Sequence, residues 1–343
     1  ALKKTLESAG LTFVFTNQVL GPGAYTVLVK DLAAFTSRYG TNGIDIAGTY
    51  SGSLANGGES IGLSGPFNVP ILDFDYRDSR GWPVSVDGAG HALVPLSRAD
   101  QANEELDAGD NWRAGTYRHG SPGRADPVPF VNLTINELAA HTDNLDTNNF
   151  PLHDSDDWIE LFNAAATNIN LGDWYLSDDP DDLKKWAIPH TNSIAPGSWI
   201  SFDETTGFHD PITSGFGLNK AGESIFLSYL PGTAEDRVAD AIRFKGQEND
   251  VSWGRFPDGD TNLYTTARTR DAANALTGVI PHPDVPRDFL SGALAHIANG
   301  QQWLGHDGLL SWLVETRLSP DGPAADPTAV VRAAANLQRF LAE

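Results

Sequence analysis

The chain has 343 residues, including 34 glycines and 21 prolines, and its formal net charge is −22. A surface of this charge repels phosphate backbones, which argues against nucleic-acid binding, and no stretch is long and apolar enough to predict a membrane span. The chain contains no cysteine, which excludes disulfides, zinc–thiolate sites and cysteine nucleophiles. It also contains no methionine, so we expect a processed product or a part of a longer chain. At about 150 residues per domain, the length predicts two domains.

Short runs rich in β-branched and aromatic residues, separated by Gly, Pro, Asn or Asp, predict strands from the start to about residue 275. In chain order these are Phe13–Phe15, Tyr25–Val29, Ile61–Leu63, Ile71–Tyr76, Leu133–Leu138, Trp158–Phe162, Trp199–Phe202, Ser224–Tyr229 and Val238–Phe244. Many short strands with turn-rich joints are typical of a β-sandwich or barrel. The sequence therefore predicts a mainly β protein.

The composition changes after Ala275. A proline-rich joint, TGVIPHPDVP, is followed by three segments with helical spacing, Arg287–Asn299, Gly308–Arg317 and Pro327–Ala342. In the last of these, apolar residues recur at steps of three and four and form one stripe. The sequence therefore predicts a short α-helical C-terminal region within residues 276–343.

An internal repeat is the main organisational signal. The segment VLGPGAYTVLV at 19–29 resembles SIAPGSWISF at 193–202, and LANGGESIGLS at 54–64 resembles LNKAGESIFLS at 218–228. Two motifs in the same order indicate duplicated domains, which we place at 1–127 and 128–275. We expect Gly58 and Gly222, which occupy the same place in the two repeats, to have matching backbone conformations.

Five motifs of the second copy follow a recognisable order. They are LTINELAAH at 133–141, DSDDWIELFNAAATNINLGDWYLSDDPDDLKKWAIP at 154–189, SIAPGSWISF at 193–202, AGESIFLSY at 221–229 and VSWGRFPDG at 251–259. Together they resemble the bacterial lamin-tail domain over about Pro129 to Ala275. The resemblance implies two tandem immunoglobulin-like β-sandwiches in an exported protein, where such domains serve as surface-attachment or accessory modules.

The first copy matches only the later part of this pattern. It has no counterpart of INEL or DWIELFN, so we expect the strands equivalent to Leu133–Leu138 and Trp158–Phe162 to be absent from it. An open sandwich exposes apolar surface and unpaired strand edges, which recruit another strand. We therefore expect protein from outside residues 1–343 to fill the gap, either neighbouring domains of a longer chain or another molecule that adds a strand. A first domain closed by the tail or by the second sandwich is the alternative.

Acidic clusters are the best candidates for a binding site. Asp156 and Asp157 precede the predicted strand of Trp158, and Asp178 and Asp179 follow the next tryptophan-containing run. Loops from different strands meet at one end of a sandwich, and carboxylates there suit calcium, which takes six to eight oxygen ligands. The sequence therefore predicts calcium at Asp156, Asp157, Asp178 and Asp179, with solvated acidic turns as the alternative. No other cofactor is predicted.

Patterns that could carry catalysis are weak. GESIG at 58–62 fits the G-x-S-x-G nucleophile elbow, which requires a strand, a strained turn and a helix, but a strand-like run follows this serine. Glu137 and Glu160 could be read as the carboxylate pair of a glycosidase, but on predicted strands they are expected to bond neighbouring backbone or to cap the sheet edge. The nine histidines show no spacing typical of metal ligands. We therefore predict no catalytic residue and no independent enzyme.

These observations predict a non-catalytic structural or interaction module of a secreted or cell-surface bacterial protein, with self-assembly outside the cell as a further hypothesis. The alternative is an accessory module of a secreted hydrolase that binds carbohydrate or another polymer. An exposed row of aromatic side chains would favour the alternative, whereas contacts between copies of the chain would favour the first hypothesis.

Overall fold

The computed structural model describes residues 4–8, 10–16, 18–78, 81–96, 103–130, 133–140, 142, 157–209, 215–248 and 251–276. Within these residues the protein is mainly β, as predicted, with two α-helices, α1 (Leu32–Tyr39) and α2 (Asn103–Leu106). The three segments with helical spacing beyond Arg287 lie outside the described residues.

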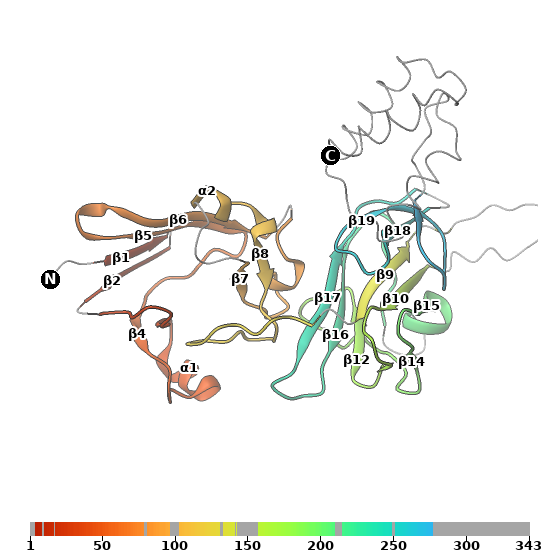
Figure 1. Ribbon diagram of the computed structural model, residues 1–343, viewed down its shortest axis with the longest axis horizontal. Helices are drawn as coiled ribbons and strands as arrows, with labels where there is room; N and C mark the ends of the chain where they lie inside the picture. Colours follow the sequence, from red (N-terminus) through yellow and green to blue (C-terminus); the bar gives the residue numbers. More distant parts are fainter. Residues whose placement is uncertain are drawn as a thin grey trace, which may run out of the picture.

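The N-terminal unit, residues 4–130, is built on a four-stranded antiparallel sheet in the order β2-β1-β5-β6 (Figure 1). Its strands are β1 (Lys4–Ser8), β2 (Leu11–Phe15), β5 (Gly58–Ser64) and β6 (Pro70–Arg77). Two small pairs accompany this sheet: β3 (Val27–Val29) runs parallel to β4 (Ile46–Thr49), and β7 (Leu93–Pro95) runs antiparallel to β8 (Trp112–Ala114). Single 3₁₀ turns are η1 (Pro66–Asn68), η2 (Val84–Val86) and η3 (Gly109–Asn111).

Helix α1 is an element that the sequence patterns did not predict. It joins the parallel strands β3 and β4, which cannot be connected by a tight hairpin. Asp31 caps its start, because its Oδ1 accepts a hydrogen bond from the Ala34 amide at 2.9 Å, and Gly40, with φ of +68°, ends it. Its eight residues make about two turns, which is too short for a recognisable apolar stripe.

The C-terminal unit, residues 133–276, contains two larger sheets. One has the order β15-β10-β9-β18-β19-β20, with β9 (Leu133–Ala139), β10 (Trp158–Asn163), β15 (Trp199–Asp203), β18 (Val251–Arg255), β19 (Leu263–Ala267) and β20 (Ala275–Leu276). The other has the order β13-β12-β16-β17, with β12 (Trp174–Ser177), β13 (Trp186–Ala187), β16 (Ser224–Tyr229) and β17 (Arg237–Arg243). A short pair, β11 (Ile169–Asn170) with β14 (Ser193–Ile194), and a π-helical turn, η4 (Glu204–Phe208), complete the unit.

A single apolar core lies between the two sheets of the C-terminal unit. Side chains that alternate along the strands supply it, among them Ile135 and Leu161 of one sheet and Leu176, Ile225 and Leu227 of the other, all 0% exposed. The N-terminal unit is far less well packed: within its described residues, the buried apolar side chains are Leu11, Val29, Trp82, Ala89 and Leu106. Since burial of apolar surface is the main stabilising term, the C-terminal unit is expected to be the more stable of the two described units.

Each of the nine predicted strands overlaps a strand of the structure, so this part of the prediction is confirmed. The predicted division at residues 127 and 128 falls in the connection between β8 and β9 and stays a prediction.

The repeat seen in the sequence corresponds to equivalent local structures. In both four-stranded sheets the GESI strand stands third, next to the strand that follows it in the chain. Gly58 and Gly222 have φ of +111° and +100°, so the matching backbone φ predicted for them is confirmed. The following glutamates also correspond, because Glu59 accepts from the Ala55 amide at 2.7 Å and Glu223 from the Asn219 amide at 2.6 Å.

The proline–glycine turns of the repeat match as well. Gly23 and Gly197, with φ of +72° and +64°, each occupy the third position of a turn closed by a backbone hydrogen bond. This is the position of a type II turn that requires positive φ. The second turn leads into β15, which pairs with β10, whereas the first leads into β3, which pairs with β4.

Replacement of Gly222 with alanine is expected to destabilise the C-terminal unit by roughly 1–3 kcal/mol. A Cβ there would lie 2.6 Å from the Phe244 carbonyl oxygen and 2.7 Å from the Lys245 Cα, in addition to the unfavourable φ. Gly232→Ala is the matched control, because its φ is +79° but a Cβ would meet nothing within 4 Å. Urea unfolding followed by tryptophan fluorescence measures both variants, and equal losses would contradict a steric role for the approach at Gly222.

Candidate functional site

The residues predicted to bind calcium are placed as follows. Asp156 lies outside the described residues. Asp157 is buried at the start of β10, where its carboxylate accepts from the Thr142 hydroxyl at 3.0 Å. Asp178 and Asp179 follow β12 and share one cation, because the Lys185 Nζ lies 2.8 Å from Asp178 and 3.5 Å from Asp179.

The described residues contain no group of three or more His, Asp or Glu side chains arranged to hold a metal ion. Lys185 and the Asp181 amide, which donates to Asp179 at 2.9 Å, instead stabilise the charged carboxylates of this turn and lower the pKa of Asp179. Calcium at the four aspartates therefore stays a prediction, and the ion pairs around Lys185 agree with the alternative of an acidic turn.

The GESIG serine lies within a strand. Ser60 is in β5 and opposite Asp75 of β6, and its hydroxyl donates to the Asp75 carboxylate. A nucleophile elbow would place the serine on the turn between a strand and a helix. The motif instead marks the beginning of a strand in both repeats.

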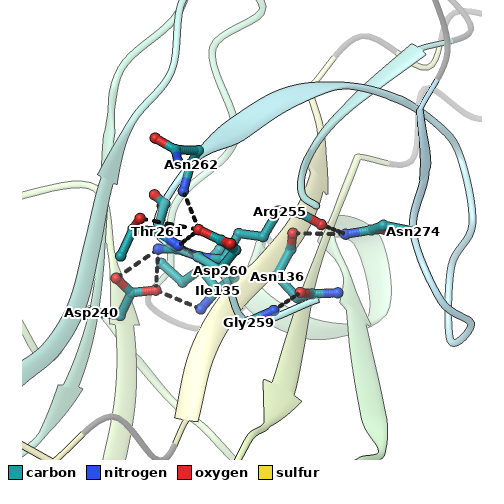
Figure 2. A network of polar contacts seen from close by, with 9 residues as sticks. All are labelled: Ile135, Asn136, Asp240, Arg255, Gly259, Asp260, Thr261, Asn262 and Asn274. Atoms are coloured by element: carbon teal, nitrogen blue, oxygen red, sulfur yellow. Dashed lines mark hydrogen bonds and ion pairs between the residues drawn. The ribbon is translucent and has the colours of Figure 1, made fainter. Parts of the chain in front are cut away.

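A buried network of polar side chains joins the two sheets of the C-terminal unit (Figure 2). Arg255 of β18 forms a bidentate ion pair with Asp240 of β17, with both Nη2–oxygen distances 2.9 Å. Its Nε donates to the Ile135 carbonyl at 2.8 Å, and its Nη1 donates to the carbonyls of Asp260 and Thr261. All donor nitrogens of this guanidinium therefore have acceptors, which is the condition for burying an arginine.

Glu137 and Glu160 lie opposite each other on β9 and β10, and both are 0% exposed. Glu137 accepts from the Ser252 hydroxyl and from the Thr269 amide and hydroxyl, and Glu160 accepts from Asn136 Nδ2 at 2.9 Å and from the Asp271 amide at 2.5 Å. The expectation that they bond neighbouring backbone is thus met at Thr269 and Asp271. Both carboxyl groups lie on the sheet face opposite the core residues Ile159 and Leu161, where they are buried beneath the backbone of Thr269 and Asp271. Their position therefore does not resemble that of a glycosidase pair facing a sugar.

Burial raises the pKa of both carboxyl groups, and that of Glu160 rises to about 8. The proximity of the two carboxyl groups acts in the same direction, because two adjacent negative charges repel. Asn136, which bridges Glu160, Asp258 and the Gly259 amide, sits at a β-bulge where the register of β9 against β10 shifts. The pair therefore holds a proton at neutral pH inside a structural network.

The four-stranded sheet of the N-terminal unit has one apolar and one polar face. The register places Leu6, Phe13, Leu63 and Leu72 in one row, with Leu11, Ile61 and Phe74 in the next row of the same face. The opposite face carries Glu7, Thr12, Ser60, Asp73 and Asp75. Of the seven apolar side chains, Leu11 is buried and the others are intermediate in exposure.

The apolar face has only a partial cover. In the C-terminal unit, Ile225 and Leu227 stand at the positions equivalent to Ile61 and Leu63 and are completely buried by the facing sheet. In the N-terminal unit short elements take the place of the facing sheet. Strand β4 is one of them, because it approaches Phe13 so closely that a Cβ added to its Gly48 would lie 3.0 Å from the Phe13 ring. Trp112 of β8 packs on Phe74 at 5.1 Å between ring centroids. The described residues of this unit contain no sheet equivalent to β9, β10 and β18.

Strand β2 is the exposed edge of this sheet. It pairs with β1 along its length, and within the described residues its other edge makes a single bridge, between Leu11 and Gly52. Its sequence, LTFVF, has no charge and no proline, and Val14 is 39% exposed. An apolar edge strand without such protection is a site where another strand adds.

A row of aromatic side chains lies where the two units meet. The Arg237 guanidinium stands 4.8 Å from the Phe130 ring centroid and 4.7 Å from that of Tyr229, and Tyr117 packs on Phe130 at 6.2 Å. A polymer-binding platform needs open ring faces, whereas one face of Phe130 and one of Tyr229 are occupied by Arg237. These side chains therefore pack against one another at the contact between the two units.

Comparisons of the chain with family models, with curated proteins and with solved structures found no match. No helix in the described part of the chain has the length and hydropathy needed to cross a membrane.

Proposed function

We propose that the chain is a non-catalytic structural module of a secreted or cell-surface bacterial protein, which self-associates by adding the β2 strand of one copy to that of another. The order of the lamin-tail motifs and the arrangement of two sheets around one core support an immunoglobulin-like, lamin-tail-type fold for the C-terminal unit. The single observation that carries the proposal is the uncharged outer edge of β2, which beyond the bridge at Leu11 has no strand beside it among the described residues.

The other edge strands of the three larger sheets are protected, which sets β2 apart. Strand β6 begins at Pro70 and carries three charged side chains, and its Asp75 amide donates to Asp107 at 2.7 Å. Strand β15 ends at Asp203, which pairs with Arg270 at 3.1 Å, and β13 and β20 have two residues each. Strand β17 carries three charged side chains, and its Val238 amide donates to His91. Charges, prolines and short strands are the usual ways in which proteins prevent edge pairing. Among the described edges of these sheets, β2 alone lacks such protection.

A second copy is the partner that this edge fits. Two β2 strands related by a twofold axis run antiparallel, and such a contact buries the same patch on both copies. Pairing would extend the sheet from four to eight strands and would place the two apolar faces side by side on one side of it. The charge of −22 opposes the approach of two copies, so self-association is expected to strengthen as added salt screens this repulsion.

Val14→Lys is expected to abolish self-association, because it places a charge in the middle of the edge strand. Ile71→Lys is the matched control: Ile71 is 48% exposed on the polar face of the same sheet, but it lies on β6, at the opposite edge. Mass photometry and analytical ultracentrifugation of the full chain between about 1 and 100 µM measure the result. We expect dimers or larger species for the wild type and for Ile71→Lys, and monomers for Val14→Lys. A wild type that stays monomeric over this range in high salt would refute the proposal.

A further inference from the structure

His91 joins the N-terminal unit to the edge of the C-terminal unit. Its side chain is buried, with 7% exposure. Its Nε2 lies 2.9 Å from the Val238 backbone nitrogen, and its Nδ1 lies 2.6 Å from the Gly115 carbonyl oxygen. A backbone N–H only donates, so Nε2 must accept and the ring proton must be on Nδ1, which donates to Gly115. Only the neutral ring makes both hydrogen bonds.

Val238 belongs to β17, the last strand of its sheet. Two residues earlier, the Asp236 carbonyl accepts from the Arg118 amide at 2.9 Å. Alternate residues of an edge strand direct their free backbone groups to the same side, so Arg118 and His91 occupy the place of a neighbouring strand. Two further contacts join the units here. Ala89 packs in a buried apolar cluster with Phe226, Leu230 and Val238. Arg243 donates to the Asp78 carbonyl at 3.0 Å.

We propose that His91 is an acid-sensitive latch: protonation of its ring releases the edge of β17 from the N-terminal unit. The imidazolium carries a proton on both nitrogens, so Nε2–H would face the Val238 N–H, and one buried acceptor would be lost. A positive charge would also be placed in a buried site without a free carboxylate beside it.

The charged groups around His91 are arranged so that protonation of its ring is unfavourable while β17 is docked. On its own side of the junction stand Arg118 and His119, which oppose protonation, and Asp126, which favours it. Asp126 is already engaged by Arg113 at 2.6 Å and by the Thr116 amide at 2.9 Å. Asp236 and Arg237, which precede Val238 at the start of β17, carry opposite charges, and Arg237 is held between aromatic rings.

Burial, together with Arg118 and His119, lowers the pKa of His91 below its ordinary value. A group whose pKa is lower in the docked state than in the undocked state binds a proton more readily in the undocked state. Protonation of His91 therefore favours separation of β17 from the N-terminal unit. Docking is therefore fully stable above about pH 6.5, the ordinary histidine pKa, and is lost progressively as the pH falls below it.

Hydrogen exchange of the full chain tests the latch. The Val238 amide, measured with mass spectrometry on peptides covering 236–240 and corrected for intrinsic exchange, is expected to lose protection about tenfold between about pH 7.5 and pH 5. Peptides from β9 are the internal control, because this strand lies in the core of the same unit. His91→Gln is the matched variant, since its amide offers both an acceptor and donors but does not titrate.

Loss of protection in the wild type with retention in His91→Gln supports the latch. Equal loss in both proteins, or no loss in the wild type, overturns it. Nitrogen-15 shifts of the His91 ring provide a second measurement that needs no variant. We expect a bare Nε2 at neutral pH, and a ring that carries its proton on Nε2 would also overturn the proposal.

Discussion

Replacing Arg255 with methionine is expected to lower the free energy of unfolding of the C-terminal unit by about 3–5 kcal/mol. The substitution keeps an aliphatic side chain but leaves Asp240, whose side chain is 14% exposed, without its bidentate partner. The carbonyls of Ile135, Asp260 and Thr261 lose their donor at the same time. A buried charge and buried acceptors without partners are each destabilising, so the loss exceeds that of an ordinary ion pair.

Urea unfolding followed by tryptophan fluorescence measures this loss. Arg243→Met is the matched control, because Arg243 is 40% exposed and pairs with Asp87 at 3.5 Å, and an exposed pair contributes about 0–1 kcal/mol. The double variant Arg255→Met/Asp240→Leu is expected to recover part of the loss, since it removes the unpaired charge. A single-variant loss no larger than that of Arg243→Met would show that the network does not hold the two sheets together.

Glu160→Gln is expected to remove most of the decrease in stability that the wild type shows as the pH rises from about 4.5 to about 8. In the folded state burial raises the pKa of Glu160 to about 8. The folded protein therefore keeps a proton that the unfolded chain releases, so this contribution to stability is present below the unfolded pKa and is lost as the pH rises through the folded one. The shift corresponds to roughly 4 kcal/mol over this window.

The measurement is the free energy of unfolding from urea titrations at several pH values. Glu248→Gln, which makes the same substitution at an exposed site, is the control and should follow the wild-type profile. The glutamine cannot reproduce every hydrogen bond of the acid, so a constant loss at all pH values is expected beside the flatter profile. An unchanged slope in Glu160→Gln would show that this carboxyl group is not the one that holds the proton. The latch at His91 has the opposite sign, and local exchange at β17 distinguishes it from this global effect.

Local patterns determined which segments are strands and where the turns lie. Alternation in Leu133–Leu138 and clusters of β-branched residues elsewhere predicted nine strands, because a strand half buried in a sheet needs apolar side chains at every second position. The positive φ at Gly58 and Gly222 was also predictable, since the repeat placed one glycine at the same point of two similar turns. Composition alone also narrowed the function: the net charge argued against nucleic-acid binding, and the absence of cysteine excluded disulfides, zinc–thiolate sites and cysteine nucleophiles.

The partners of individual side chains were decided only by the tertiary structure. Nothing near Arg255 in the sequence indicates Asp240, and nothing near His91 indicates Val238, 147 residues away. The strand Phe13–Phe15 was predicted, but its position at the edge depends on which strands pair beside it. Pairing between distant segments is set by the closure of the whole core, which a local pattern does not contain. Sequence therefore determined nine of the strands and the turns of the repeat, whereas the three-dimensional packing decided the exposed edge, the buried ion pair and the latch.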